Sequence, residues 1–368
     1  MTSTSVTEGT GMPSFSVLRD QLWQAVSNVD DTHAVALVRH AAHALAQAEG
    51  TSPQTAAERV LLELIAPTQE RVGVEWAANT ITIAQEHAAT AINERCVSAV
   101  ADTAPATPEP AKGRLTVACV DGEWHALPAR LVAEVLRLRG WHVDYLGAQV
   151  PTQHLIAHLH QRHSDAVLLS SSIPTHLPVA HTAISSCQTA GIPVIAGGAA
   201  FGPDGAYARL MQAGWAANAG GADALLTKGI ESPTVQAARL VNADLPHLED
   251  QEYTMVRQSR RQLVKQTLVD VEEGFPVMRQ YTEYQRERTV EDIDHIVNYL
   301  ATALYVDDDA LFTRFITWTA DILVARGVPA VSLLPALGSL DRQLSDFPRA
   351  TCILATARGA LSVPGQRA

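Results

Sequence analysis

The stretch Leu115-Thr-Val-Ala-Cys-Val-Asp-Gly-Glu-Trp-His125 decides the fold class of this chain. Residues 115–120 have the apolar composition of a buried strand, and the apolar positions of 127–138 recur at helical spacing. A strand, a short loop and a helix begin a βαβ unit, the repeating element of parallel α/β sheets. Because such folds bind ligands at the carboxyl ends of their strands, we predict that His125 points into a ligand crevice. His125 is therefore the leading candidate for a metal ligand.

The same alternation continues to about residue 232. Further β-rich runs occupy 142–145, 166–170, 193–196 and 215–219, and helical runs occupy 152–162, 179–190 and 206–213. This order of elements is typical of a doubly wound parallel sheet. We therefore predict a flavodoxin-like α/β domain over residues 114–232.

Helical patterns alone fill the region upstream. Apolar positions recur at helical spacing in 17–26, 32–48, 56–64, 70–76 and 81–100, which predicts a small helical bundle over residues 14–100. Residues 101–113 contain three prolines and little apolar bulk, so we expect a linker there. Residues 1–13 are rich in Ser, Thr and Gly and lack the apolar core of a signal peptide, which predicts a disordered tail.

The pattern turns helical again beyond the α/β region. Residues 250–345 contain no convincing strand, so we predict an all-helical, globin-like domain there and a C-terminal tail over 346–368. Ten of the 19 aromatic residues of the chain lie between Tyr253 and Phe347, several of them near basic groups. Such a cluster is typical of either a pocket for a flat ligand or the core of a dimerisation module.

Composition limits the classes of partner. The formal charge of −12 and the absence of a basic arm argue against a nucleic-acid surface. No apolar run approaches the roughly 20 residues that a membrane-spanning helix needs. The four cysteines show neither a Cys-x-x-Cys pair nor the spacing of a disulfide framework. We therefore expect a soluble cytoplasmic protein.

The predicted metal ligand has neighbours of the right chemistry. Glu123 can accept the second imidazole proton of His125 and so fix the tautomer that a metal requires. The third and fourth predicted strands end in small residues at the same sheet edge, which would leave a slot for a ligand. These residues are Ser170, Ser172, Gly197 and Gly198.

In these residues the sequence resembles the cobalamin-binding domain of methionine synthase, of base-off mutases and of CarH-type light sensors. Their pattern is acid-x-His-x-x-Gly, a serine at a strand end and Gly-Gly; here Glu123-Trp124-His125, Ser170 and Gly197-Gly198 match in order, and Pro128 replaces the usual glycine. The resemblance implies that His125 ligates cobalt from below and that the serine and glycines line the slot for the nucleotide tail. An unliganded flavodoxin-like domain is the alternative.

The helical bundle resembles the cofactor cap of CarH-type photoreceptors. Their signature of a Trp, nine residues and Glu-His is met by Trp76, Glu86 and His87, whereas the histidine that follows the tryptophan in those sensors is replaced by Ala77. The resemblance implies that Trp76 and Glu86 contact the adenosyl group of adenosylcobalamin and that His87 supports the pocket. A methyl side chain at 77 cannot capture cobalt, so we expect no two-imidazole state after illumination. Ordinary bundle residues are the alternative.

The whole layout resembles the photocobilins, in which a C-terminal helical domain binds a bilin such as biliverdin. The resemblance implies a second chromophore in the region 250–345, where arginines can take the propionates in bidentate fashion. The candidate contact residues are Arg279, Tyr284, His295, Tyr299 and Arg314. Binding is expected to be noncovalent, since Cys352 lies past the aromatic cluster.

Three functions are consistent with these features. The first is a light sensor, not an enzyme, whose photochemistry changes domain packing or the state of a homo-oligomer, with a dimer expected. The second is a corrinoid carrier that shuttles methyl groups between methyltransferases. The third is a regulator that senses cobalamin itself. No output domain is visible, so a signal would pass through oligomeric state or a separate partner.

Overall fold

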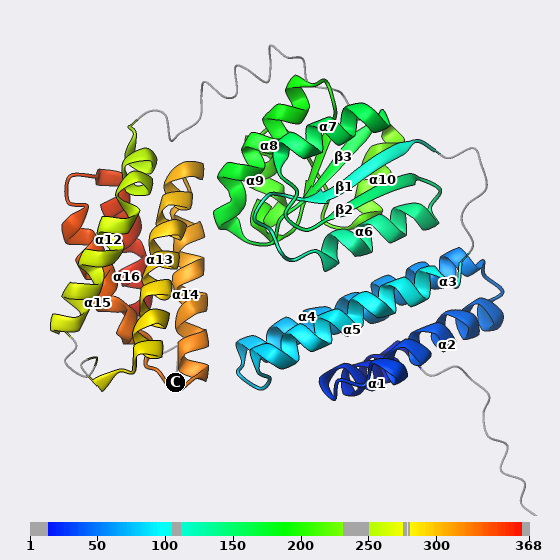
Figure 1. The fold of residues 1–368 in the computed structure, drawn as a ribbon, viewed down its shortest axis with the longest axis horizontal. Helices are drawn as coiled ribbons and strands as arrows, with labels where there is room; N and C mark the ends of the chain where they lie inside the picture. Colours follow the sequence, from blue (N-terminus) through cyan, green and yellow to red (C-terminus); the bar gives the residue numbers. More distant parts are fainter. Residues whose placement is uncertain (1–13, 105–111, 231–249, 275–277, 279, 363–368) are drawn as a thin grey trace, which may run out of the picture. The chain divides into compact units, whose positions relative to one another are not determined.

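The computed structural model describes residues 14–104, 112–230, 250–274, 278 and 280–362 (Figure 1). It forms two compact units, one made of Met1–Val117 with Ala126–Gly147 and the other of Ala118–His125 with Ala148–Ala368. The predicted tail at 1–13 and most of the predicted linker, 105–111, lie outside the described residues.

The N-terminal region is helical, as predicted. Its elements are α1 (Phe15–Ser27), α2 (Asp31–Glu49), α3 (Pro53–Val60), a π-helical turn η1 (Leu61–Ile65), α4 (Ala66–Ala77) and α5 (Ile83–Ala101). Residues Leu22, Leu64 and Val97 are fully buried, so the apolar stripes of three of these elements face inward. Thr82 begins α5 with a capping box closed by Gln85, which fixes where the α4–α5 turn ends.

Helix α6 packs on the bundle within the first unit. Arg139, which follows α6 (Leu127–Leu138), places its Nη2 2.6 Å and its Nε 3.0 Å from the two carboxylate oxygens of Glu58 on α3. This two-point ion pair is the geometry in which a guanidinium binds a carboxylate most strongly. It ties the bundle to the first helix of the α/β region.

The α/β region contains the predicted parallel sheet. Its five strands are β1 (Arg114–Cys119), β2 (His142–Gly147), β3 (Ala166–Ser170), β4 (Val194–Gly197) and β5 (Gly214–Trp215), in the order β2-β1-β3-β4-β5. The helices that follow α6 are α7 (Thr152–Arg162), α8 (Leu177–Thr189), α9 (Ala206–Leu210) and α10 (Ala219–Lys228), with 3₁₀ turns η2 (Pro174–His176), η3 (Ala199–Phe201) and η4 (Pro203–Gly205). β5 is shorter than the predicted strand at 215–219 because Asn218 already caps α10 by accepting from the N–H of Gly221.

Strand register brings three strand ends to one edge. β3 pairs parallel with β4, with Ser170 opposite Gly197. Just beyond β1, the N–H of Val120 donates to the carbonyl of Ser170, and the N–H of Ser171 donates to the carbonyl of Gly197. The loops that follow β1, β3 and β4 therefore begin side by side.

The elements of the C-terminal region, in its described residues 250–274, 278 and 280–362, are helices and a 3₁₀ turn. The region contains α12 (Glu252–Gly274), α13 (Glu283–Val306), α14 (Asp309–Ala325), η7 (Ala330–Leu333), α15 (Leu334–Gln343) and α16 (Pro348–Ser362). A globin-like arrangement of these helices stays a prediction. Among the described residues, no helix has both the length and the apolar content that crossing a membrane requires.

The prediction of a tail from residue 346 is wrong, because α16 lies there. Its residues Ile353 and Leu354 are buried, and its N-terminus is held by Glu252 of α12, whose carboxylate accepts from the N–H groups of Arg349 and Ala350 at 3.1 and 2.8 Å. The carboxylate supplies partners for the first N–H groups of the helix, which have none inside it. This anchor comes from almost a hundred residues upstream, so the local pattern does not reveal it.

Candidate functional site

A buried carboxylate organises the loop after β1. The side chain of Glu123 is 0% exposed, and its Oε1 accepts from the backbone N–H of His125 at 2.9 Å and from the Nδ1 of the same imidazole at 2.6 Å. Gly122 precedes it with φ +84°, a left-handed conformation that turns the chain back on itself. The predicted pairing of Glu123 with His125 is thus present.

The second oxygen of Glu123 binds the loop after β3. Oε2 accepts from the hydroxyl of Ser171 at 3.0 Å and from the N–H groups of Ser172 and Ile173 at 2.6 and 3.2 Å. The Nδ1 of His176, on η2, lies 3.4 Å from the same oxygen. Glu123 therefore links two strand ends that are about fifty residues apart in the sequence.

Electrostatics fix the protonation of this cluster. Burial by itself raises the pKa of Glu123, but the imidazoles of His125 and His176 and the backbone N–H groups of His125 and Ser172 hold the pKa far below its usual range. The carboxylate is therefore ionised and can only accept hydrogen bonds. The proton on Nδ1 of His125 therefore faces Glu123, and in a neutral imidazole this is the tautomer that suits a metal ligand through Nε2.

The side chains around His125 suit a metal whose other ligands come from a cofactor and not from the protein. Among the residues that the structure describes, no three His, Cys, Asp or Glu side chains converge on a metal position. The His125 side chain is 58% exposed, whereas its partner Glu123 is fully buried. One imidazole held by a buried carboxylate would fit a cobalt bound in a corrin, because the macrocycle would supply most of the metal's ligands. A zinc site closed by protein ligands needs more donors.

The three serines at the end of β3 make different contacts from those predicted. The side-chain contact to Glu123 is made by Ser171, which the sequence did not single out, while Ser170 contributes its carbonyl to Val120 and Ser172 its N–H to Glu123. Side chains alternate between the two faces of a strand, so one residue of register decides which serine faces Glu123. A run of three serines does not reveal that register.

One of the paired glycines, Gly198, is required by the backbone. Gly198 has φ +99°, and a Cβ built on it would lie 2.2 Å from the carbonyl oxygen of Ser171. At Gly197 the nearest atom to such a Cβ is the Ala216 carbonyl oxygen, at an ordinary 3.4 Å. Gly198 thus permits the close approach of the β4 loop to the Ser171 segment that holds Glu123. The predicted approach of a ligand to these glycines stays a prediction.

The predicted cap residues lie together at one end of the α4–α5 hairpin. Trp76 is in the last turn of α4 and half-buried, and Glu86 and His87 are in the first turns of α5. Glu86 is hydrogen-bonded to the His87 imidazole and, at 3.1 Å, to the hydroxyl of Thr90. These residues belong to the first unit, whereas His125 belongs to the second. Trp124, beside His125, is 74% exposed.

The predicted bilin contacts are spread over two helices. Tyr284, His295 and Tyr299 lie along α13, and Arg314 lies on α14. Tyr299 stacks on Phe315 at 3.7 Å between ring centroids, whereas Arg314 donates to the hydroxyl of Tyr207 at 3.1 Å. Arg279 lies outside the described residues. Of these four residues, His295 lines a cavity between α12 and α13, and the lining of that cavity does not include the other three.

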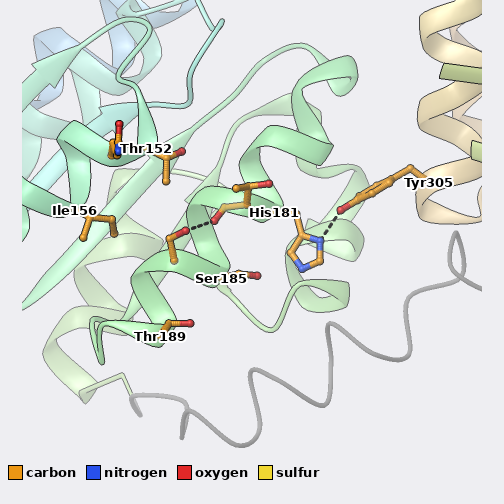
Figure 2. A pocket seen from close by; sticks show the side chains of 9 residues that line it. Thr152, Ile156, His181, Ser185, Thr189 and Tyr305 are labelled. Carbon is orange, nitrogen blue, oxygen red and sulfur yellow. Dashed lines mark hydrogen bonds between the residues drawn. The ribbon is translucent and has the colours of Figure 1, made fainter. Parts of the chain in front are cut away.

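A separate pocket of about 740 Å³ lies on α7 and α8 (Figure 2). Figure 2 shows the hydroxyl groups of Thr152, Ser185 and Thr189 along it, and the hydrogen bond of 2.6 Å between His181 and Tyr305 of α13 at one end. None of the predicted site residues lines this pocket, so it is not the candidate cobalt site.

Comparisons with known proteins match both the helical bundle and the α/β region to family models. Residues 113–224 match the family model "B12 binding domain", and residues 18–101 match a second model with the same description. A search of curated proteins finds no significant relative. The chain therefore contains two B12-binding domains and is a cobalamin-binding protein.

Similar solved structures have low sequence identity. The monomethylamine corrinoid protein of Methanosarcina barkeri is 18% identical with a TM-score of 0.46, covering 58% of this chain and 99% of its own. A cobalamin-binding protein from Desulfitobacterium hafniense DCB-2 is 16% identical with a TM-score of 0.33, covering 59% and 98%. The methanol:cobalamin methyltransferase complex of M. barkeri is 16% identical with a TM-score of 0.31, covering 59% and 82%.

Proposed function

We propose that the protein holds its cobalamin through His125, which ligates the cobalt from below, and that it serves as a corrinoid carrier. The observation that carries the first part is the buried, ionised Glu123, which orients the His125 imidazole and fixes its proton on Nδ1. Cobalt in a corrin supplies a reactive bond to a carbon group at its upper face. The chain's own contribution is to hold and orient the lower ligand.

The carrier assignment rests on the residues expected above the corrin. Ala77 follows Trp76 and offers no atom that can ligate a metal. Glu86 already accepts from Thr90 and is bonded to His87, so its carboxylate is engaged within the bundle. An upper face without a competing protein ligand leaves room for a methyl group to be exchanged with partner proteins, which is what a carrier requires.

A light sensor that binds adenosylcobalamin is the second candidate, and a different observation favours it. Apolar side chains are exposed on both sides of the α4–α5 turn that follows Trp76, since Val74 and Ile83 are 62% and 61% exposed. A wide aromatic ring next to apolar side chains suits a nucleoside group. A bilin in the C-terminal helices belongs to this candidate alone.

The two candidates differ in the preference for the upper ligand. Equilibrium dialysis of the full chain in the dark, with methylcobalamin and with adenosylcobalamin, tests this difference. A carrier without a nucleoside pocket binds the two forms within about threefold, and neither Trp76→Ala nor Glu86→Ala changes their ratio. A preference of tenfold or more for adenosylcobalamin that these substitutions abolish, with Glu94→Ala on the exposed face of α5 as the control, would replace the carrier by the sensor.

A further inference from the structure

The described part of the C-terminal region contains a small cavity where several of its elements meet. Its volume is about 260 Å³. The lining comes from α12, α13, α14, η7 and α15, together with Met278 and Tyr281 from the segment between α12 and α13. Glu123 and His125 do not belong to this lining. The cavity is therefore separate from the candidate cobalt ligand.

The inner wall of this cavity is apolar. Its apolar side chains are between 2% and 7% exposed and include Val271, Ile293, Ile296, Leu333 and Ala336. An apolar cavity of about 150 Å³ is large enough to bind benzene. A volume of about 260 Å³ therefore has room for a benzene ring with a short chain attached.

Asp292 is an acidic residue in the lining of this cavity, on α13. In the part of the chain that the structure describes, no hydrogen bond or ion pair is made by its carboxyl group. The residue as a whole is exposed, yet the protein around the carboxyl group removes enough water to raise the pKa of Asp292 above its ordinary value of 3.8. The charged form of Asp292 therefore lacks part of its solvation.

The neighbouring charges offset this loss only in part. Arg288 also lines the cavity, but its guanidinium lies 2.7 Å from a carboxylate oxygen of Glu291 and 5.2 Å from the centre of the Tyr284 ring. The charges of His295 and Arg288 lower the pKa of Asp292 less than burial raises it, and Glu291 adds to the rise. A cation that binds the carboxylate directly would supply the missing stabilisation.

Two polar neighbours of Asp292 in the lining are engaged within α13. The hydroxyl of Thr289 donates to the carbonyl of Gln285 at 2.9 Å, and the side chain of Gln285 closes the capping box of the helix. An apolar cavity with a carboxylate beside it is complementary to an organic cation. We propose that this cavity binds a small monoamine, whose apolar body enters the cavity and whose ammonium group binds the carboxylate of Asp292. The charge of this ligand is opposite to that of the propionates expected at the bilin contacts, and the site is independent of cobalamin.

Isothermal titration calorimetry tests the proposal on the full chain loaded with methylcobalamin in the dark, so that a methyl group occupies the upper position of cobalt. The probes are 2-phenylethylamine, its neutral analogue 2-phenylethanol and its anionic analogue 3-phenylpropionate. The amine is expected to bind at least fivefold more tightly than either analogue. The proposal is overturned if the amine does not bind, or if its advantage over either analogue is less than fivefold.

The variant Asp292→Asn keeps the shape of the side chain and removes its charge. It is expected to lose at least fivefold in affinity for the amine and less than twofold in affinity for the alcohol. The matched control is Glu287→Gln, which changes an exposed carboxylate on α13 outside the cavity lining and is expected to bind like the wild type. A smaller loss in Asp292→Asn, or an equal loss in the control, contradicts the proposal.

A second variant tests whether the probe enters the cavity. Ala336→Leu adds apolar atoms to the wall formed by α15 and is expected to weaken the binding of both the amine and the alcohol at least fivefold. If a folded Ala336→Leu protein binds both probes like the wild type, they bind elsewhere and the proposal fails. Circular dichroism melting of all three variants checks that they are folded.

Discussion

The Nδ1 of His125 lies 2.6 Å from Oε1 of Glu123, while Oε2 of the same carboxylate is bound to the loop after β3. The orientation of the imidazole is therefore determined by a strand end about fifty residues away as well as by its own loop. An imidazole held in this way is preorganised, since its partner Glu123 is buried and cannot rotate without losing several hydrogen bonds.

Replacing Glu123 by Gln tests this preorganisation. The side-chain amide places an NH₂ group against N–H donors, so at least one hydrogen bond is lost in a buried site, at a cost of about 2 kcal/mol. The affinity for cobalamin is expected to fall about 10- to 100-fold, as is typical when the partner of a metal-ligating histidine is removed. Equilibrium dialysis measures it, with Glu94→Gln on the exposed face of α5 as the control. Unchanged affinity would show that Glu123 does not hold the ligand.

Gly198 offers a test of the β4 loop. Its φ is +99°, and an added Cβ would lie 2.2 Å from the Ser171 carbonyl oxygen, so Gly198→Ala must displace the segment that binds Glu123. We expect a loss of at least about 2 kcal/mol in the free energy of unfolding, measured in urea. Gly73→Ala is the control, because Gly73 lies in helix α4 with no atom near its added Cβ. That change is expected to stabilise the protein by about 0.5–1 kcal/mol.

A pH dependence is expected in the C-terminal region. The pKa of Asp270 is lowered from 3.8 by hydrogen bonds from Ser339 and Gln266, against the opposing effect of burial, and by Arg342. A carboxyl whose pKa is lower in the folded state stabilises the fold above its unfolded pKa, and this stabilisation is lost as the pH falls through the folded pKa. Asp270→Asn should therefore speed hydrogen exchange of α12 at pH 7 and have a progressively smaller effect below about pH 4. If Asp270→Asn speeds hydrogen exchange equally at pH 7 and below about pH 4, this expectation is contradicted.

Illumination provides a test of the upper face. Because Ala77 cannot ligate a metal, the protein loaded with adenosylcobalamin and exposed to green light is expected to show one histidine nitrogen on cobalt. Electron–nuclear double resonance and visible absorption spectra, recorded before and after illumination, measure the number of protein nitrogens bound to cobalt. Two protein nitrogens after photolysis would identify another histidine as an upper ligand and would contradict this expectation.

Local sequence patterns are sufficient for the central part of the site. The strand, the loop and the helix around Glu123 and His125 follow from hydrophobic spacing, and so does the position of their loop at the sheet edge. The sequence patterns do not predict the contacts of Ser171 and His176 with Glu123, and the reason is the same for both. Their roles depend on how β3 registers against its neighbours, which a run of serines followed by a short turn does not reveal.

The C-terminal region is less predictable, because its contacts are long-range. The N-terminus of α16 is held by Glu252, and that pairing has no local signature. Aromatic residues beside basic ones suggest one pigment pocket, but Tyr299 stacks on Phe315 and Arg314 binds Asp308 and Tyr207.

The most direct test of the central claim is the electron paramagnetic resonance spectrum of the cobalt(II) form, recorded on full chain labelled with ¹⁵N-histidine. The wild type and the control His154→Ala, which changes an exposed histidine on α7, are expected to show coupling to one ¹⁵N nucleus. His125→Ala is expected to lose that coupling and to retain cobalamin at least tenfold more weakly. If the His125→Ala spectrum keeps the histidine coupling, His125 is not the cobalt ligand and the account fails.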